Sequence, residues 1–248
     1  MTTIRMLMQV AAQYNMFVHQ LDVKTAFLNA PIDHEVYVKQ PDGFQETRKG
    51  VKLVWKLQKS LYGLKQSGRN WNFVLTEVIL ADNFKQSEVD PCLFVKKENN
   101  DNYIYIVIWV DDIVIATTSE ALLNSTKDML KRKFNIKDLG EISYFLGIEF
   151  ELSNGGILMG QSHYIKHILE RFDMTDCKPR ATPCEAKLEA YEKTVENTAE
   201  DIKRYREIVG SLIYVMVCTR PDLSFVVTRL SQNLEKPTEG DWITIKHV

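Results

Sequence analysis

Several features that would point directly to a function are scarce in this sequence. Its four cysteines are far apart and form no C-x-x-C pair: Cys92, Cys177, Cys184 and Cys218. This spacing argues against a disulfide framework and a zinc knuckle, so reduced and mostly buried thiols are expected. Long apolar runs are missing as well. The run over residues 104–110 ends at two aspartates, and it is far shorter than the roughly 20 residues that cross a bilayer.

The sequence also has no excess of charge of either sign. Lys and Arg total 31 and Asp and Glu total 33, which gives a formal net charge of −2. This balance excludes a polybasic nucleic-acid coat protein but allows a local basic surface. Arg5, Gln9 and Gln13 interrupt the apolar residues of the N-terminus, so the continuous apolar core of a signal peptide is missing. We therefore expect an intracellular protein, cytoplasmic or nuclear, that is not secreted and has no membrane partner.

Basic residues are concentrated in one segment. Residues 48–69 contain seven basic residues and no acidic one, and Trp55, Tyr62 and the nearby Trp71 are interleaved with them. Cations mixed with aromatic rings suit binding to a nucleic-acid backbone and stacking on bases. A solvated helix face with Trp and Tyr in the core explains the same pattern equally well. The basic residues are Arg48, Lys49, Lys52, Lys56, Lys59, Lys65 and Arg69.

The first two thirds of the chain alternate strand and helix signals. Residues 16–23 predict a strand that breaks into a short helix over 25–28. Residues 103–117 are rich in β-branched and aromatic types and predict two strands joined by a tight turn at Asp111-Asp112. A helix over 121–134 follows, and a hairpin is expected over 144–159. This order predicts an α+β fold rather than a doubly wound one.

After residue 160 the pattern becomes helical. Ser162 is expected to cap a helix, a second helix is expected over 202–218, and Pro221 is typical of the first position of a third. Residues 242–248 also have a helical pattern. Between these helices, an acidic stretch around 173–201 indicates a solvated linker. We therefore expect one domain over 1–159 and another over 160–248.

Asp111 and Asp112 are the first candidates for chemistry. Two like charges between apolar strands repel each other and are poorly solvated, so a cation is the natural compensation. Carboxylate oxygens favour magnesium over zinc. A third oxygen donor is then required, and Asp22 at the end of a strand is the best candidate. Two simpler interpretations stay open. The pair forms a plain turn, although Asp-Asp lacks the glycine usual there, or Asp22 caps the following helix.

Two other motifs do not hold. Residues 63–68 have the glycine spacing of a P-loop, but Arg69-Asn70 follows where Lys and Ser or Thr are required. His163 and His167 are four residues apart on an expected helix, yet the glutamate of a zinc protease motif is missing between them. We expect this histidine pair to face solvent.

Five segments, in order along the chain, carry a resemblance to a known family. They are QLDVKTAFLN at 20–29, SLYGLKQ at 60–66, VDD at 110–112, YFLGIE at 144–149 and CTRPD at 218–222. Together they resemble the reverse transcriptase of copia-type long-terminal-repeat retrotransposons. In that family the first contains a catalytic aspartate, the second contacts template and nucleotide, the third holds the paired aspartates and the fourth is the primer grip. The likeness covers nearly the whole chain.

The resemblance implies a right-hand polymerase of the α+β class. Residues 1–159 would form a palm with partial fingers, and residues 160–248 a helical thumb. Asp22, Asp111 and Asp112 would be catalytic and hold two Mg²⁺ ions, which Mn²⁺ can replace, with the Val23 carbonyl as a further ligand. One ion would activate the primer 3′-hydroxyl, and the other would neutralise the triphosphate and the leaving pyrophosphate.

The resemblance also implies contacts to nucleotide and nucleic acid. Phe27 would exclude a ribose 2′-hydroxyl, Tyr62 and Gly63 would border the nucleotide, and Lys137 would protonate the pyrophosphate. The sequence departs from the family at Trp109, where a tyrosine is usual, and at Ser67-Gly68, where Ala-Pro is frequent. The residues implied to contact template or primer are Lys65, Arg69, Trp109, Phe145, Leu146 and Gly147.

The implied partners are an RNA or DNA template with its primer, deoxynucleoside triphosphates, and the rest of a Pol polyprotein. That polyprotein would supply an upstream fingers segment and a downstream RNase H domain. We therefore expect a truncated part of a longer protein that by itself binds template and primer weakly and extends the primer barely or not at all. Two alternatives stay open. One is a catalytically silent remnant that at most binds nucleic acid, and the other is a palm-type nucleotidyl cyclase, which the primer-grip and Tyr62-Gly63 motifs disfavour.

Overall fold

The computed structural model describes residues 1–98, 102–153, 156–185 and 196–248. It divides the chain into two compact units, Thr2–Ile142 and Ser143–Val248. The boundary expected after residue 159 lies farther along the chain than this division. The difference arises because strands β11 (Tyr144–Phe145), β12 (Ile148–Ser153) and β13 (Gly156–Gly160) form a sheet of their own within the second unit.

The described residues of the first unit form a six-stranded sheet, called the large sheet, with the order β10-β1-β9-β8-β7-β6. Each neighbouring pair in it is antiparallel. With the helices, this arrangement confirms the expected α+β class. The strands are β1 (Phe17–Val23), β6 (Lys85–Gln86), β7 (Leu93–Lys97), β8 (Tyr103–Trp109), β9 (Asp112–Thr117) and β10 (Ile136–Glu141).

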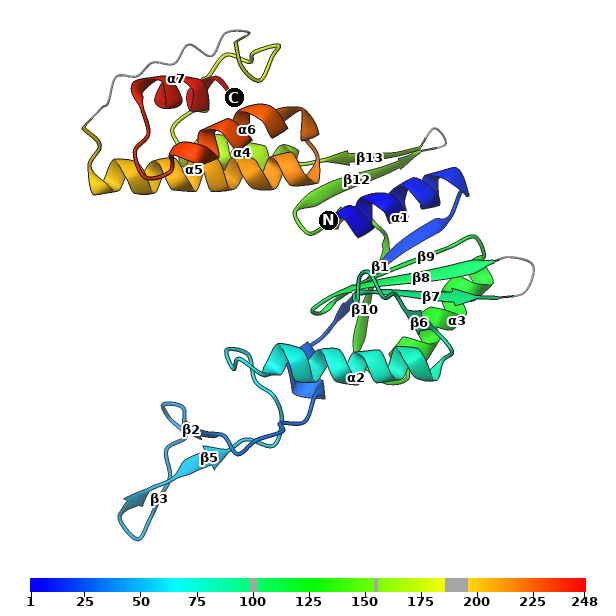
Figure 1. Cartoon of the computed structure of the whole chain (residues 1–248). Helices are drawn as coiled ribbons and strands as arrows, with labels where there is room; N and C mark the ends of the chain where they lie inside the picture. The colour runs from blue at the N-terminus through cyan, green and yellow to red at the C-terminus, as the bar shows by residue number, and fades with distance from the viewer. Residues whose placement is uncertain (99–101, 154–155, 186–195) are drawn as a thin grey trace. The chain divides into compact units, whose positions relative to one another are not determined.

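A thin ribbon extends from the first unit, away from the large sheet (Figure 1). It consists of two short antiparallel pairs, β2 with β5 and β3 with β4. Its side chains are largely exposed, including Trp55 at 43%. The strands are β2 (Tyr37–Lys39), β3 (Thr47–Arg48), β4 (Val51–Lys52) and β5 (Val54–Lys56).

The two faces of the large sheet are occupied differently. Alternate side chains such as Leu21, Val23 and Ile113 share a buried cluster with helices α2 (Ser67–Ala81) and α3 (Glu120–Lys131). Successive strand residues point to opposite faces, so Gln20, Asp22 and Asp112 lie on the other face. Helix α1 (Thr2–Gln13) contacts β9. Hydrophobic burial on one face thus positions the carboxylates on the other.

The local predictions for the first unit are confirmed in outline, with one correction. Strand β1 breaks into a short 3₁₀ helix, η1 (Ala26–Asn29), and α3 follows β9 as expected. The tight turn lies at Val110-Asp111 rather than at the predicted Asp111-Asp112. Asp112 belongs to β9 because it pairs with both Trp109 and Asp22.

The described part of the second unit combines the β11–β13 sheet with helices around a separate core. Tyr205, Val209, Val227 and Leu230 are buried in that core. The helices predicted over 202–218 and 242–248 are confirmed, and Pro221 begins a short 3₁₀ helix, η3. Part of the acidic linker, residues 186–195, lies outside the described residues. The helical elements are α4 (Ser162–Arg171), α5 (Ala199–Cys218), η3 (Pro221–Leu223), α6 (Ser224–Leu230), η4 (Ser231–Asn233) and α7 (Glu239–His247).

The prediction that Ser162 caps α4 is wrong. Gln161 precedes the helix without a side-chain cap, and Ser162 is its first residue. The capping group is the Glu149 carboxylate on β12, which accepts hydrogen bonds from the Ser162 and His163 backbone N–H groups at 3.2 and 2.8 Å. These bonds hold the pKa of Glu149 below its usual range. A carboxylate also suits the positive end of the helix dipole, so a tertiary contact replaces the local cap.

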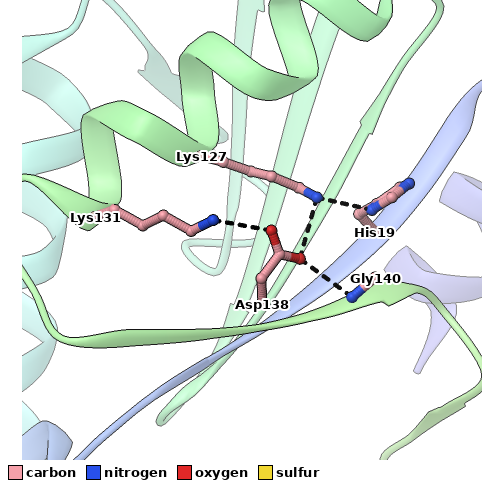
Figure 2. A network of polar contacts seen from close by, with 5 residues as sticks. All are labelled: His19, Lys127, Lys131, Asp138 and Gly140. Carbon is pink, nitrogen blue, oxygen red and sulfur yellow. Dashed lines mark hydrogen bonds and ion pairs between the residues drawn. The ribbon is translucent and has the colours of Figure 1, made fainter.

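A polar network centred on the buried Lys127 fastens the edge strand β10 to the rest of the large sheet (Figure 2). The Lys127 ammonium on α3 contacts His19 Nδ1 at 2.8 Å and Asp138 Oδ1 at 3.1 Å. Lys131 binds the other Asp138 oxygen at 3.0 Å, and the Gly140 N–H donates to Oδ1 at 3.1 Å. Although burial opposes it, these partners lower the pKa of Asp138 to about 2. Asp138 follows Lys137 in β10, so the network and the Lys137 side chain lie on opposite faces of that strand.

This network makes stability depend on pH. Burial and the Lys127 charge lower the pKa of His19 from 6.5, against the opposing effects of Asp138, Glu141 and Glu120. The unfolded chain therefore takes up a proton that the folded chain resists, so the free energy of unfolding falls as pH drops below 6.5. We expect His19→Gln to flatten this part of the profile in urea unfolding measured across that range.

The exposed His34 provides the control. His34→Gln should leave the wild-type slope unchanged. An unaltered slope in His19→Gln would contradict the role given to His19.

Candidate active site

Four side chains form a row across the large sheet. Asp22 lies opposite Asp112 on β9 and opposite Lys137 on β10, and Asp112 lies opposite Trp109 on β8. Directly opposed residues share a face, with Cβ atoms about 4.5–5.5 Å apart. The order Trp109, Asp112, Asp22, Lys137 therefore brings two carboxylates together between an exposed indole and an exposed ammonium group.

Asp111 joins this row through the turn between β8 and β9. Its carbonyl accepts a hydrogen bond from the Val23 N–H at 2.8 Å, which ties the turn to the residue after Asp22. The preceding residue, Val110, has a φ of +56°. A left-handed conformation is disfavoured for a β-branched side chain, and glycine usually occupies it in such turns. Asp111 is thus presented by a strained loop.

The Asp112 carboxyl group senses both neighbouring carboxylates. Burial raises its pKa above the usual range, and Asp111 and Asp22 raise it further by like-charge repulsion. A hydrogen bond from Gln20 Nε2 at 2.9 Å opposes this shift. Gln20 is 6% exposed, so Asp112 is oriented from inside the sheet. A cation bound next to these carboxylates would relieve their repulsion.

The donor chemistry of the site fits a hard divalent cation. Asp22, Asp111 and Asp112 offer carboxylate oxygens, the ligands that magnesium prefers. Within the described ranges, however, no three His, Cys, Asp or Glu side chains are gathered in an arrangement that could hold a metal ion. The strands bring the donors to the same region. Their carboxylate side chains would have to turn toward a cation in order to bind it.

The residues predicted to contact the nucleotide fall into two groups. Phe27 and Tyr62 lie against each other, with ring centroids 4.4 Å apart and planes inclined at 38°. Gly63 follows Tyr62 with a φ of +96°, a conformation that favours glycine. Lys137 lies instead in the row, beside Asp22. The structure brings Phe27 to Tyr62 and Lys137 to Asp22.

The basic segment is exposed, while one of its aromatic rings is not. Lys65 and Arg69 face solvent, and the Arg69 guanidinium lies over the Phe73 ring at 5.2 Å. Tyr62 is 50% exposed, whereas Trp71 is 1% exposed. Trp71 is therefore a core residue, as the solvated-helix alternative expected of it, whereas the exposed Tyr62 is available for stacking. The Trp71 indole N–H donates to the Val110 carbonyl.

The segment expected to grip a primer is a turn in the second unit. Phe145 is buried at 1% exposure, and the next two residues have positive φ, +49° at Leu146 and +71° at Gly147. This pair of angles is that of a type I′ hairpin turn. The Tyr214 hydroxyl on α5 donates to the Leu146 carbonyl, and burial raises the pKa of Tyr214 to about 12.

Two residues of these sites are not identified by sequence reasoning. Gln20 has a usable signal, because it precedes Asp22 by two residues and strand alternation puts both on one face. Tyr214 has none, since its partner Leu146 is 68 positions away. The His163 and His167 side chains are exposed, as expected for a pair facing solvent.

The sequence comparisons decide the family. Residues 1–186 match the family profile described as reverse transcriptase (RNA-dependent DNA polymerase). The chain belongs to this family. It is 36% identical over 255 residues to the retrovirus-related Pol polyprotein from transposon TNT 1-94 of Nicotiana tabacum, covering 100% of this chain and 19% of the polyprotein. The resemblance to copia-type retrotransposon enzymes is confirmed.

Two further relatives agree. The Pol polyprotein from transposon RE1 of Arabidopsis thaliana is 39% identical over 249 residues, or 100% of this chain and 17% of its own length. The transposon Ty1-MR1 Gag-Pol polyprotein of Saccharomyces cerevisiae is 28% identical over 251 residues, or 94% of this chain and 14% of its own length. This reverse transcriptase chain thus spans less than a fifth of these relatives. In its described part, the helices are too short or too polar to cross a membrane.

The turn at Gly147 should tolerate alanine poorly. A Cβ atom there would lie 2.9 Å from the Tyr214 hydroxyl, and the backbone φ is +71°. The left-handed conformation alone costs an alanine about 1–2 kcal/mol. We expect Gly147→Ala to lower the free energy of unfolding by more than that, measured by urea denaturation.

Two variants separate the contact from the backbone effect. Gly140→Ala has a similar φ, +78°, with no atom within 4 Å of the added Cβ, so it should show the backbone cost alone. Tyr214→Phe removes the crowding oxygen, and the double variant should lose less than the sum of the single losses. Simple additivity would contradict the contact.

Proposed function

We propose that this chain is an RNA-directed DNA polymerase domain that adds deoxynucleotides to a primer by two-metal phosphoryl transfer. The observation that carries the proposal is the pairing of Asp22 with Asp112, together with the bond from Val23 to the Asp111 carbonyl. This register brings Asp22 and Asp112, which are 90 positions apart, to one sheet face, and the bond to Val23 ties Asp111 beside them. Membership of the reverse transcriptase family supports the same reaction.

The three aspartates would hold the metal. Asp22, Asp111 and Asp112 supply carboxylate oxygens, and the Val23 backbone carbonyl would be a further ligand. When bound, two Mg²⁺ or Mn²⁺ ions would activate the primer 3′-hydroxyl and neutralise the triphosphate and the leaving pyrophosphate. Gln20 keeps one Asp112 oxygen oriented during this step. The mutual repulsion of the carboxylates is the driving force for binding cations there.

The neighbouring residues would select and orient the nucleotide. Phe27 would lie under the sugar and exclude a 2′-hydroxyl, and its contact with Tyr62 keeps the ring in place. Gly63 allows the backbone to come close to the nucleotide. Lys137 is opposite Asp22, where its ammonium group can donate a proton to the leaving pyrophosphate.

Nucleic acid would be held by exposed residues of the first unit and by a turn of the second. Lys65 and Arg69 would contact phosphates, and the exposed Trp109 would lie beside the primer end. Phe145, Leu146 and Gly147 would form the primer grip, with Phe145 as its buried anchor. The large sheet would be the palm, the ribbon a part of the fingers, and the helices of the second unit a thumb. The partners would be template with primer, deoxynucleoside triphosphates and the rest of a Pol polyprotein.

Two observations favour a second candidate, a catalytically silent remnant. Among the described residues no metal-holding group of three is formed, and Trp109 stands at a position where the family usually has a tyrosine. Such a remnant would bind nucleic acid through the basic segment without extending a primer. The two functions differ in whether primer extension depends on Asp111.

A primer-extension assay with the 248-residue chain separates them. We expect the chain by itself to incorporate deoxynucleotides only at a low, Mg²⁺-dependent level. Asp111→Asn should lower that rate by at least about 10²-fold, because charge stabilisation at the reacting phosphate disappears. Asn keeps the size of the side chain, so folding is preserved. The exposed Asp42→Asn is the matched control and should keep the wild-type rate. Equal rates in wild type and Asp111→Asn would favour the silent remnant.

A second experiment tests the basic segment. Replacing Lys65 and Arg69 with Ala should weaken binding of an RNA–DNA hybrid irrespective of sequence. The slope of log affinity against log salt should shrink by about 0.9 for each phosphate that the variant no longer neutralises. The control replaces Lys85 and Arg132, exposed elsewhere on the same unit, and should leave the slope unchanged. An unchanged slope in the first variant would show that these cations only solvate the surface.

A further inference from the structure

The turn that carries Asp111 does not stabilise itself. Val110 has a φ of +56° and is 44% exposed, so burial of its own side chain does little to hold it. A non-glycine residue in this region is strained and persists only where its surroundings impose the conformation. Something outside the turn must therefore supply the constraint.

Trp71 supplies a constraint of the right kind. Its side chain is 1% exposed, and its indole N–H donates to the Val110 carbonyl. The indole packs edge-on against Phe134, with ring centroids 5.0 Å apart and planes at 77°. Because the indole is fully buried, breaking this bond would leave its donor without water as a substitute.

The bond acts directly on Asp111. The Val110 carbonyl and the Asp111 N–H belong to one planar peptide group, so holding that oxygen restrains the peptide plane that precedes the Asp111 Cα. The next peptide group is held as well, because the Asp111 carbonyl accepts from the Val23 N–H at 2.8 Å. Asp111 is thus clamped on one side by α2 and on the other by β1.

Helix α2 holds a second functional loop from the same face. Ser67 lies four residues before Trp71, which is one helical turn. The Ser67 hydroxyl donates to the Leu61 carbonyl at 2.6 Å and accepts from the Leu61 N–H at 3.1 Å. Leu61 precedes Tyr62 and Gly63, so one rigid element fixes both the nucleotide loop and the aspartate turn.

We propose that Trp71 is a positioning residue for Asp111, whose indole N–H holds the Val110-Asp111 turn in its strained conformation. The proposal rests on the proposed polymerase function and deepens it. The Trp71 indole acts through the Val110 carbonyl. It sets where the Asp111 carboxylate lies relative to Asp22 and Asp112.

The test uses Trp71→Phe, which keeps an aromatic ring in the core and removes the donor. Amide hydrogen exchange at Val23 reports opening of the turn, and we expect it to become at least about fivefold faster, as for the removal of one hydrogen bond. The control is Trp242→Phe, which removes an indole donor to Asn197 Oδ1 at 3.0 Å. It should leave Val23 exchange unchanged.

Two functional readouts accompany the exchange measurement. We expect the kcat of single-nucleotide addition to fall by roughly 10²-fold, since misplacing a catalytic group by about 1 Å has that effect. The KM for the nucleotide should stay at its wild-type value, because Phe27 and Tyr62 are untouched. Mn²⁺ affinity, measured by electron paramagnetic resonance, should weaken. Changes of similar size in both kcat and KM, with Val23 amide exchange unchanged, would show that Trp71 has only a structural role. That result would overturn the proposal.

The remaining outcomes are separable. If wild type adds no nucleotide while Trp71→Phe accelerates Val23 exchange, the polymerase function fails and the anchoring of Asp111 is supported. If Trp71→Phe does not fold, the test is hydrogen exchange of the Trp71 indole N–H in the wild-type chain. We expect this indole to exchange far more slowly than the indole of the exposed Trp55. An indole that exchanges as fast as Trp55 would overturn the proposal.

Val110→Gly removes the strain, so in that background the effect of Trp71→Phe on exchange should shrink.

Discussion

The antiparallel register of β1 against β9 and β10 determines where Asp22, Asp112 and Lys137 lie in the candidate active site. Side chains alternate between faces with a period of two, so a slip by one residue would turn Asp22 into the core and Leu21 out of it. Leu21 and Val23 are 0% and 1% exposed, and full burial of such side chains contributes about 1.5–3 kcal/mol each. The energy that prevents the slip therefore comes from apolar residues on the face opposite to the chemistry.

That arrangement brings with it two unfavourable terms. Asp112 lies among like charges, and burial raises its pKa further, while Val110 is held in a left-handed conformation. Both terms are offset by contacts from outside the turn: Gln20 on β1 and Trp71 on α2. Strain and repulsion concentrated at a few residues, and balanced by a well-packed surround, are typical of functional sites.

How much of this can be predicted depends on the range of each interaction. The strand ending at Asp22 and the apolar hairpin around Asp111 follow from local patterns, and so does the α+β class. Local patterns mispredict the position of the turn, because Asp112 pairs with Asp22 on another strand. They also mispredict the cap of α4, because the capping carboxylate of Glu149 comes from β12. They leave open whether Trp71 is exposed or buried, since composition cannot tell a stacking ring from a buried one. The pairing of Asp22 with Asp112 requires either the coordinates or the family resemblance.

The two turns implicated in function share one construction. In each, a non-glycine residue has a positive φ, Val110 at +56° and Leu146 at +49°. In each, the carbonyl of that residue accepts a hydrogen bond from an aromatic side chain on a helix, the Trp71 indole or the Tyr214 hydroxyl. An aromatic side chain suits this task because it combines a large apolar body, few rotatable bonds and a single polar group. A longer donor such as lysine would lose more side-chain entropy on being held in place. Rigid aromatic donors thus allow each turn to keep a conformation that its own sequence disfavours, and the helices that carry them set the geometry of the loops.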